Sequence, residues 1–350
     1  MGGGGSERVI SILANYYASE HYSVHIIQLI NSESFYPLDK QITLSGMNIS
    51  IRRKNRIISK WDQLRFFLKS LLFIKNEIDN LQPNVIISFM RQTCIIMYLL
   101  KCFGMKTRLI LSERNDPTVQ NIFIRLLMNK IYKKCDVFVC QTQKVADYFN
   151  IIDHTVVIPN PIETKNLPNK YTGKRRKVIV SVGRLDKQKN FSLLIHSFDI
   201  ISVFYPDYIL EIYGEGPLRN KLQRLIDRRE LKDRIFLMGA YHDILEQIKD
   251  ATFFILSSNY EGFPNALIEA MAIGLPVIST NFYTGSAQEL IGNLNGILVP
   301  INDRKAMSTA MCKLLNNKKL REIMSIENIK IAEIYSDTNI INEWKKIIEK

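Results

Sequence analysis

The sequence predicts an α/β protein with two doubly wound domains, each a parallel sheet flanked by helices. Apolar runs of strand length alternate with helical patterns along the whole chain, which is typical of parallel sheets with crossover helices. At 350 residues the chain is long enough for about two domains of ordinary size. A stretch rich in proline, glycine and charge, without periodicity, separates two series of elements at residues 159–176.

The first series predicts a domain over residues 1–160. Its expected strands are Ser23–Ile30, Asn84–Phe89, Thr107–Ser112, Asp136–Gln141 and Thr155–Ile158. Its expected helices are Glu7–Glu20, Asp62–Leu81, Thr93–Phe103, Val119–Lys134 and Lys144–Asn150. A doubly wound domain normally opens with a strand, whereas this chain opens with glycines. The pattern therefore predicts that the first strand is missing.

The second series predicts a domain over residues 177–335, joined to the first by a linker at 161–176. Its expected strands are Lys177–Val182, Tyr208–Gly214, Arg234–Met238, Thr252–Ser257, Pro276–Ser279 and Gly296–Val299. Its expected helices are Asn190–Phe204, Pro217–Arg229, His242–Lys249, Asn265–Gly274, Gly285–Ile291 and Arg304–Leu315. A last amphipathic helix within 336–350 has no strand after it, and we expect it to pack back on the first domain.

The amino-acid composition is that of a soluble globular protein. Apolar residues make up 46% and charged residues 23%, as in soluble globular proteins. No apolar run approaches the roughly 18 residues of a membrane span. Five cysteines without paired spacing predict reduced thiols and a cytoplasmic location.

The net charge of +13 is partly concentrated at residues 51–69, where seven cations face one acid, Asp62. Phe66, Phe67, Leu71 and Leu72 accompany these charges. This combination favours a peripheral site on an anionic membrane surface over nucleic acid. A solvated helix face with an ordinary core side fits the pattern equally well.

The most informative motif holds Glu261 and Glu269, eight residues apart, after the apolar run 251–256. Pro264 suits the first position of a helix, so Glu261 is expected on the strand–helix loop and Glu269 in the second helical turn. Helix N-termini bind phosphate, and neighbouring carboxylates bind hydroxyl groups. The loop therefore suits a nucleotide-sugar. Alone, the two glutamates would more often be a solvent-facing acid and a charge pair.

A second motif, Arg184 and Lys189, follows another predicted strand and ends at a helix start near Asn190. Two cations there can hold a diphosphate and stabilise its charge as it leaves. An exposed basic turn is the alternative. Gly239 ends the next-but-one strand, where backbone groups can meet a nucleobase.

Glycines at Gly3, Gly4 and Gly5 lead into the first expected helix, with Ser6 as its N-cap. Such a turn lets a phosphate or a sugar approach the backbone. The same composition also suits a flexible linker. No Asp-x-Asp, His-Glu-x-x-His or paired Cys-x-x-Cys occurs, so the sequence indicates no catalytic metal and no cofactor.

Together these motifs resemble family 4 of the retaining glycosyltransferases, which have the GT-B fold. The resemblance is strongest over residues 180–300, which contain Ser-Val-Gly-Arg-Leu-Asp-Lys-Gln-Lys-Asn, Tyr-Gly-Glu-Gly-Pro-Leu and Glu-Gly-Phe-Pro-Asn-Ala-Leu-Ile-Glu-Ala-Met-Ala. Gly-Gly-Ser-Glu-Arg near the start and Ile-Pro-Asn-Pro before the linker extend the resemblance to most of the chain.

The resemblance implies roles for individual residues. Arg184 and Lys189 would bind the donor diphosphate, Glu261 the donor sugar and Glu269 the ribose hydroxyls. The backbone around the second motif would lie near the phosphates, at Gly262, Phe263, Asn265 and Ala266.

Two departures from the family pattern stand out. Pro264 replaces a frequent glycine, which removes one amide. Arg114 lies near the place of a first-domain histidine, and we expect it to contact the acceptor or its pyrophosphate, assisted by Glu113 and Asn115.

The expected activity is transfer of a hexose from a nucleotide-diphosphate sugar, most simply UDP-linked, to a lipid-linked glycan acceptor, with retention and without a metal. The expected setting is bacterial surface-polysaccharide assembly at the inner face of the plasma membrane. A GT-B epimerase or hydrolase of UDP-sugars is the enzymatic alternative. A basic nucleic-acid-binding protein is the alternative from another class, and no helix-turn-helix or aromatic RNA platform supports it.

Overall fold

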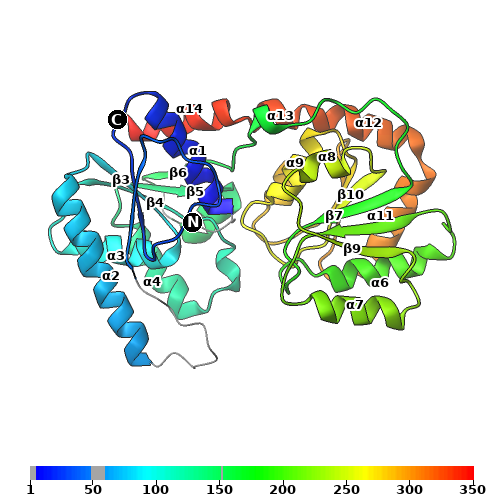
Figure 1. Ribbon diagram of the computed structural model, residues 1–350, viewed down its shortest axis with the longest axis horizontal. Helices are drawn as coiled ribbons and strands as arrows, with labels where there is room; N and C mark the ends of the chain where they lie inside the picture. The colour runs from blue at the N-terminus through cyan, green and yellow to red at the C-terminus, as the bar shows by residue number, and fades with distance from the viewer. Residues whose placement is uncertain (1–4, 49–59, 151–152) are drawn as a thin grey trace.

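A computed structural model describes residues 5–48, 60–150 and 153–350, and it contains two parallel α/β domains side by side (Figure 1). The α/β, doubly wound class is confirmed. In the first domain the described helices are α1 (Gly5–Ser19), α2 (Lys60–Leu81), α3 (Arg91–Cys102), α4 (Ile122–Tyr132) and α5 (Gln143–Phe149), with a 3-10 turn at Pro117–Val119. Its strands are β1 (His25–Gln28), β2 (Thr43–Gly46), β3 (Val85–Phe89), β4 (Arg108–Ser112), β5 (Val137–Cys140) and β6 (Thr155–Val157).

After a 3-10 turn at Thr164–Asn166, the second domain forms a sheet of strand order β12-β11-β10-β7-β8-β9. Its strands are β7 (Val178–Val182), β8 (Ile209–Tyr213), β9 (Ile235–Gly239), β10 (Phe253–Leu256), β11 (Val277–Thr280) and β12 (Ile297–Val299). Its helices are α6 (Phe191–Ser202), α7 (Arg219–Arg228), α8 (Ile244–Ile248), α9 (Asn265–Ala272), α10 (Ser286–Leu290), α11 (Arg304–Asn316), α12 (Lys318–Ile329) and α13 (Ile331–Ile334).

The first domain divides its described strands between two sheets. β3, β4, β5 and β6 form one parallel sheet in chain order, and β1 pairs with β2 in another. The pairing of β1 with β2 was not predicted, because Thr43–Gly46 is short, has no buried residue and lacks an apolar run. The first helix also differs from expectation: it begins at Gly5, so Ser6 lies inside it.

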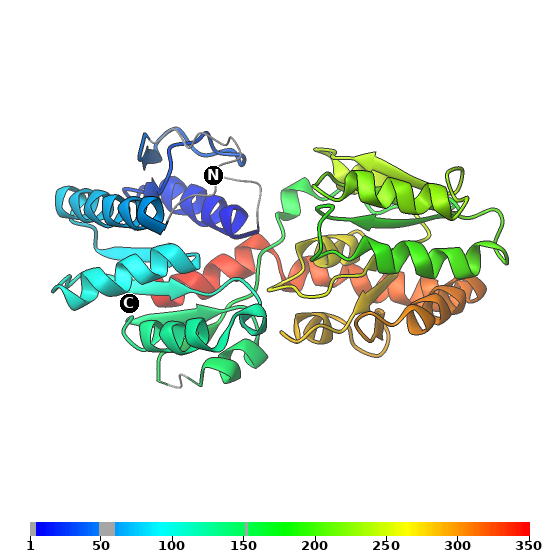
Figure 2. The ribbon, with the colours of Figure 1, turned by 90° about the horizontal axis from the view of Figure 1, so that it is seen from below.

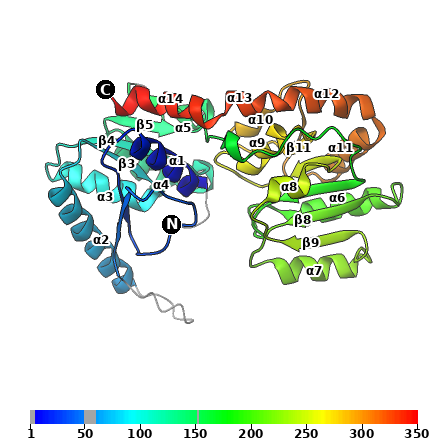
Figure 3. The ribbon, with the colours of Figure 1, turned by 45° about the horizontal axis from the view of Figure 1, so that its top comes forward.

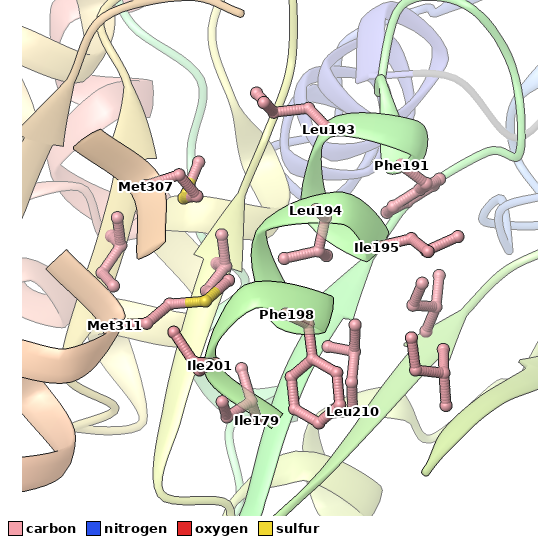
Figure 4. Close-up of a cluster of buried hydrophobic side chains, with 14 of the residues drawn as sticks. Ile179, Phe191, Leu193, Leu194, Ile195, Phe198, Ile201, Leu210, Met307 and Met311 are labelled. Carbon is pink, nitrogen blue, oxygen red and sulfur yellow. The ribbon is translucent and has the colours of Figure 1, made fainter. Parts of the chain in front are cut away.

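Apolar side chains cover both faces of each main sheet. On one face of the second sheet, α6 directs Leu194 and Phe198 toward Ile179 and Leu210, which come from β7 and β8 (Figure 4). Apolar residues recur on α6 at helical spacing, which explains why this element was recognisable from the sequence.

Strand register aligns the carboxyl ends within each sheet. Phe89 lies opposite Ser112 across β3 and β4, and Val182 lies opposite Tyr213 across β7 and β8. Loops that follow the first sheet contact loops that follow the second: Thr142 donates from Oγ1 to the Thr284 carbonyl at 2.7 Å. The two carboxyl edges therefore meet, which is where ligands bind in open α/β sheets.

The chain passes between the domains twice, and the two crossings are paired. The Ile162 amide donates to the Tyr335 carbonyl at 2.7 Å, and the Asp337 amide donates to the Ile162 carbonyl at 2.9 Å. Beyond this point α14 (Asp337–Ile348) returns to the first domain, and α12, α13 and α14 run along the top of the molecule (Figure 3).

Helix α14 packs its apolar face on α1 and the first sheet. Trp344 is 0% exposed, and its ring lies 5.9 Å from that of Phe89, centroid to centroid. None of the described helices is both long and apolar enough to cross a membrane.

Trp344→Ala should lower the free energy of unfolding by about 3–5 kcal/mol, because it leaves a large cavity between α14 and the sheet. Denaturant titration followed by circular dichroism measures the change. The chain's other tryptophan, Trp61, is 73% exposed, so Trp61→Ala should stay within about 0.5 kcal/mol of the wild type. Equal effects of the two substitutions would contradict this account of the packing.

Candidate functional site

Glu261 lies in the loop between β10 and α9, and it is only 6% exposed. Its carboxylate accepts hydrogen bonds from Lys189 Nζ at 2.6 Å, Ser258 Oγ at 2.7 Å and Gln188 Nε2 at 3.0 Å. Two residues that the sequence singled out, 72 positions apart, thus form a nearly buried ion pair. Removing one partner of such a pair typically costs about 3–5 kcal/mol, since the other charge is left uncompensated.

Arg184 lies in the same loop as Lys189 but remains open to solvent. Its side chain is 72% exposed, and its Nε donates to Asp186 at 2.7 Å. Asp186 also accepts from the backbone amides of Gln188 and Lys189, which fixes the turn before α6. An exposed, single-partner guanidinium can reorient toward a ligand, whereas Lys189 is already engaged.

The N-terminus of α9 lies beside this pair. Pro264 is the N-cap residue and makes no side-chain cap hydrogen bond. Phe263 is buried against Tyr335, and Ala266 packs at the edge of the same core. The start of α9 is therefore held by packing on one side, and helix N-termini favour anions.

Glu269, in the second turn of α9, pairs with Arg8 of α1 across the domain boundary. Arg8 Nε also lies 3.4 Å from Glu163 Oε1, in the linker. Burial disfavours the charged guanidinium, but the two carboxylates outweigh it and raise the pKa of Arg8. The motif Gly-Gly-Ser-Glu-Arg contains this arginine, but its pairing could not be predicted from the sequence, because the contact joins residues 261 positions apart.

Arg114 is not at an open surface: it is 6% exposed, and its guanidinium carbon lies 5.3 Å from the Trp344 ring centre and 5.5 Å from that of Phe89. Burial lowers the pKa of Arg114 to about 9. Its Nη1 donates to the Ile158 carbonyl at 3.2 Å and to Asn160 Oδ1 at 3.1 Å. In this arrangement Arg114 is held inside the first domain, next to the start of the linker, and its guanidinium is not exposed to an acceptor.

The residues on either side of Arg114 in the sequence form hydrogen bonds that stabilise the loop after β4. Glu113 is buried and accepts from the amides of Arg114 and Asn115 and from the Tyr132 hydroxyl. Burial raises the pKa of Glu113. The loop after β4 is therefore held rigid by its own carboxylate.

Asn160 connects the two domains at this edge. Its Oδ1 accepts from Arg114 and from Gln141 Nε2, at 3.1 and 2.7 Å, and its Nδ2 donates to Asn265 Oδ1 at 2.7 Å. The sequence offered Asn160 in Ile-Pro-Asn-Pro, but nothing local to that motif identifies its partners.

Gly262 and Gly5, two of the glycines that the sequence predicted in the site, allow segments of the two domains to approach closely. A Cβ atom on Gly262 would lie 2.1 Å from the Arg114 carbonyl oxygen and 2.7 Å from Gln141 Oε1. A Cβ atom on Gly5 would lie 2.9 Å from Asn265 Nδ2. Gly3 and Gly4 lie outside the described residues. Gly239 ends β9, and its carbonyl accepts a hydrogen bond from the Gly214 amide at 2.7 Å.

Comparisons with known proteins match two family models to the chain. The model described as "Glycosyltransferase Family 4" matches residues 3–166, and that described as "Glycosyl transferases group 1" matches residues 163–330. An uncharacterised glycosyltransferase of Methanocaldococcus jannaschii is 30% identical over 293 residues, which cover 69% of this chain and 72% of the relative.

A second relative has a named activity. The N-acetylgalactosamine-N,N'-diacetylbacillosaminyl-diphospho-undecaprenol 4-alpha-N-acetylgalactosaminyltransferase of Campylobacter jejuni is 29% identical, covering 92% of this chain and 90% of its own. Among solved structures, Anabaena Alr3699/HepE in complex with UDP and glucose aligns with a TM-score of 0.80 at 15% identity, covering 99% of this chain and 96% of its own. That likeness concerns the fold, and the expected GT-B architecture is confirmed.

Gly262→Ala should destabilise the protein by about 1–3 kcal/mol, because the new methyl group overpacks against the backbone of the other domain. Gly292 provides a matched control, since a Cβ atom there would meet no atom closer than 3.8 Å. Chemical denaturation of both variants measures the difference. A Gly262→Ala protein as stable as Gly292→Ala would contradict the close approach.

Arg8→Gln should loosen the domain boundary, because it removes the charge that holds Glu269 and Glu163. Small-angle scattering without nucleotide should then show a larger radius of gyration than the wild type. Arg224→Gln, on an exposed position of α7, is the control and should scatter like the wild type. An unchanged radius for Arg8→Gln would mean that other contacts alone close the boundary.

Proposed function

This chain belongs to the glycosyltransferases, and we propose that it is a retaining, metal-independent family 4 enzyme that transfers a hexose from a UDP-linked donor to a lipid-linked glycan. One observation carries the proposal: the nearly buried Lys189–Glu261 pair lies beside the start of α9, with exposed Arg184 in the same loop as Lys189. Cations, helix amides and a carboxylate are thus available for a diphosphate and a sugar.

In the proposed reaction, the bond between the anomeric carbon and the diphosphate oxygen breaks, and the acceptor hydroxyl oxygen forms its new bond on the same face. The hydroxyl proton passes to the departing diphosphate oxygen. Arg184 and Lys189 stabilise the negative charge that develops on the diphosphate. Glu261 orients the sugar hydroxyls, and Glu269 binds the ribose hydroxyls after exchanging its partner Arg8. Charge stabilisation and positioning supply most of the catalysis.

Backbone groups complete the proposed donor site. We assign Gly262, Phe263, Asn265 and Ala266 to the phosphates and Gly239 to the nucleobase. The carboxyl edge of the first domain, including Gly5 and the loop of Arg114, would receive the acceptor. The relatives support a lipid-linked acceptor, since one is named for a diphospho-undecaprenol substrate.

The proposed setting is the cytoplasm, at the inner face of the plasma membrane, in bacterial polysaccharide synthesis. The basic segment 51–69 motivates the anionic membrane partner; four of its seven cations lie outside the described residues. We expect no nucleic-acid partner and no cofactor apart from the donor.

Calorimetric titration with UDP and a panel of UDP-sugars tests the donor assignment. Glu269→Ala should weaken UDP binding by about tenfold or more, because charge-assisted hydrogen bonds to the ribose are lost. Arg184→Ala should chiefly lower kcat, since the charge that it meets develops in the transition state. Wild-type kinetics and binding in both variants would remove the site assignment.

Product analysis in the same assay tests the reaction type. Proton NMR of the product should show the donor's anomeric configuration, and turnover should persist with a chelator present. Release of free sugar without an acceptor product would instead favour a hydrolase.

A further inference from the structure

The outer surface of the first domain exposes apolar side chains on two of its helices. On α4, Ile122, Phe123, Leu126 and Leu127 are 53, 79, 60 and 44% exposed. On α2, a line at spacings of three and four residues is exposed by 47–73%: Trp61, Leu64, Leu68 and Leu72. Viewed from below, α2, α3 and α4 lie side by side across the domain (Figure 2), and α3 contacts both neighbours.

This surface differs from the one expected from the sequence. Phe67 and Leu71, which were expected to face a membrane, pack against the core beneath α2, and Phe66 is half-buried. Of the four apolar residues Phe66, Phe67, Leu71 and Leu72, only Leu72 is exposed. The exposed apolar side chains of α4 were not predicted, although this helix has more apolar residues than its core side can bury.

The charges around the apolar residues are mostly positive, and Asp62, next to Trp61, is the one acid on the first half of α2. Between Asp116 and Asp136 the chain holds four cations and no acid. All four of these cations are exposed: Arg125, Lys130, Lys133 and Lys134. On the first half of α2, Arg65 and Lys69 are exposed next to the apolar line.

Apolar side chains surrounded mainly by cations match an anionic bilayer. Its acyl region accepts apolar side chains, and its headgroups attract cations. A second copy of the chain matches less well. A two-fold contact through α4 would bring the same cations together, with no acid on that helix to compensate them.

We propose that the α2–α4 surface docks on an anionic lipid bilayer, with Phe123 and Leu126 of α4 and Trp61 of α2 entering the headgroup region. The biological sense of this docking rests on the lipid-linked acceptor of the proposed function. The docking itself is independent of donor and acceptor, so it is measured without either.

Flotation with vesicles of phosphatidylcholine, with and without phosphatidylglycerol, tests the surface. The double variant Phe123→Ser/Leu126→Ser should bind the anionic vesicles about tenfold more weakly than the wild type, because two inserting side chains are removed. Val203→Ser/Phe204→Ser alters an apolar pair on the second domain that is at least as exposed, and this variant should bind like the wild type. Equal binding by the two double variants overturns the proposal, as does equal binding to vesicles without phosphatidylglycerol.

Tryptophan fluorescence provides a second readout that does not depend on the α4 variant. Trp61 is 73% exposed, whereas Trp344, the other tryptophan, is fully buried. Brominated lipids should quench the emission on binding, and Trp61→Phe should abolish the quenching. Binding without quenching overturns the docking geometry.

Sedimentation equilibrium separates the competing occupant. A dimer that Phe123→Ser/Leu126→Ser converts to a monomer would overturn the proposal in favour of a second copy. UDP titration in solution, without vesicles, reports on the proposed function, so failure of either idea leaves the other measurable.

Discussion

The two passages of the chain between the domains are held together by backbone hydrogen bonds at Ile162, and this neck constrains everything at the domain boundary. Because both passages lie together, the chain connects the domains at one place. Glu163, next to the neck, contacts Arg8, and Thr164 hydroxyl donates to Asp337 at 2.9 Å. Such a geometry permits rotation about the neck while it limits sliding.

The contacts away from the neck are of a different kind. Those that join the two carboxyl edges are mostly polar, including Asn160–Asn265, Thr142–Thr284 and Gln143–Glu289, with one aromatic contact between Tyr148 and Tyr283. By contrast, α14 is fixed to the first domain by a fully buried tryptophan and isoleucines. Polar edges can exchange their partners for water or ligand at little cost, whereas the apolar packing of α14 cannot. Domain opening would therefore separate the edges and leave α14 in place.

Local pattern accounts for what the sequence could and could not predict. The run that became β10 is apolar throughout, and both of its faces are covered, so burial alone identifies it. Thr43–Gly46 carries no such signal, since its strand character arises only from pairing with β1. Likewise, Lys189 and Glu261 could each be predicted as site residues from the pattern of their own loops. The pairing of Arg8 with Glu269 depends on how the two domains are placed. Sequence spacing contains no information on that placement.

The Arg8–Glu269 pair has a consequence for affinity. The same carboxylate that the proposed donor needs already neutralises a partly buried guanidinium in this structure. A ribose that takes Glu269 would have to offset the loss of this pair, so we expect the donor affinity to be lower than that of the same contacts in a site where Glu269 is unpaired. Glu163 moderates the penalty, because Arg8 keeps one carboxylate after the exchange. If Glu269 binds the donor as proposed, the linker would influence donor binding without contacting the donor.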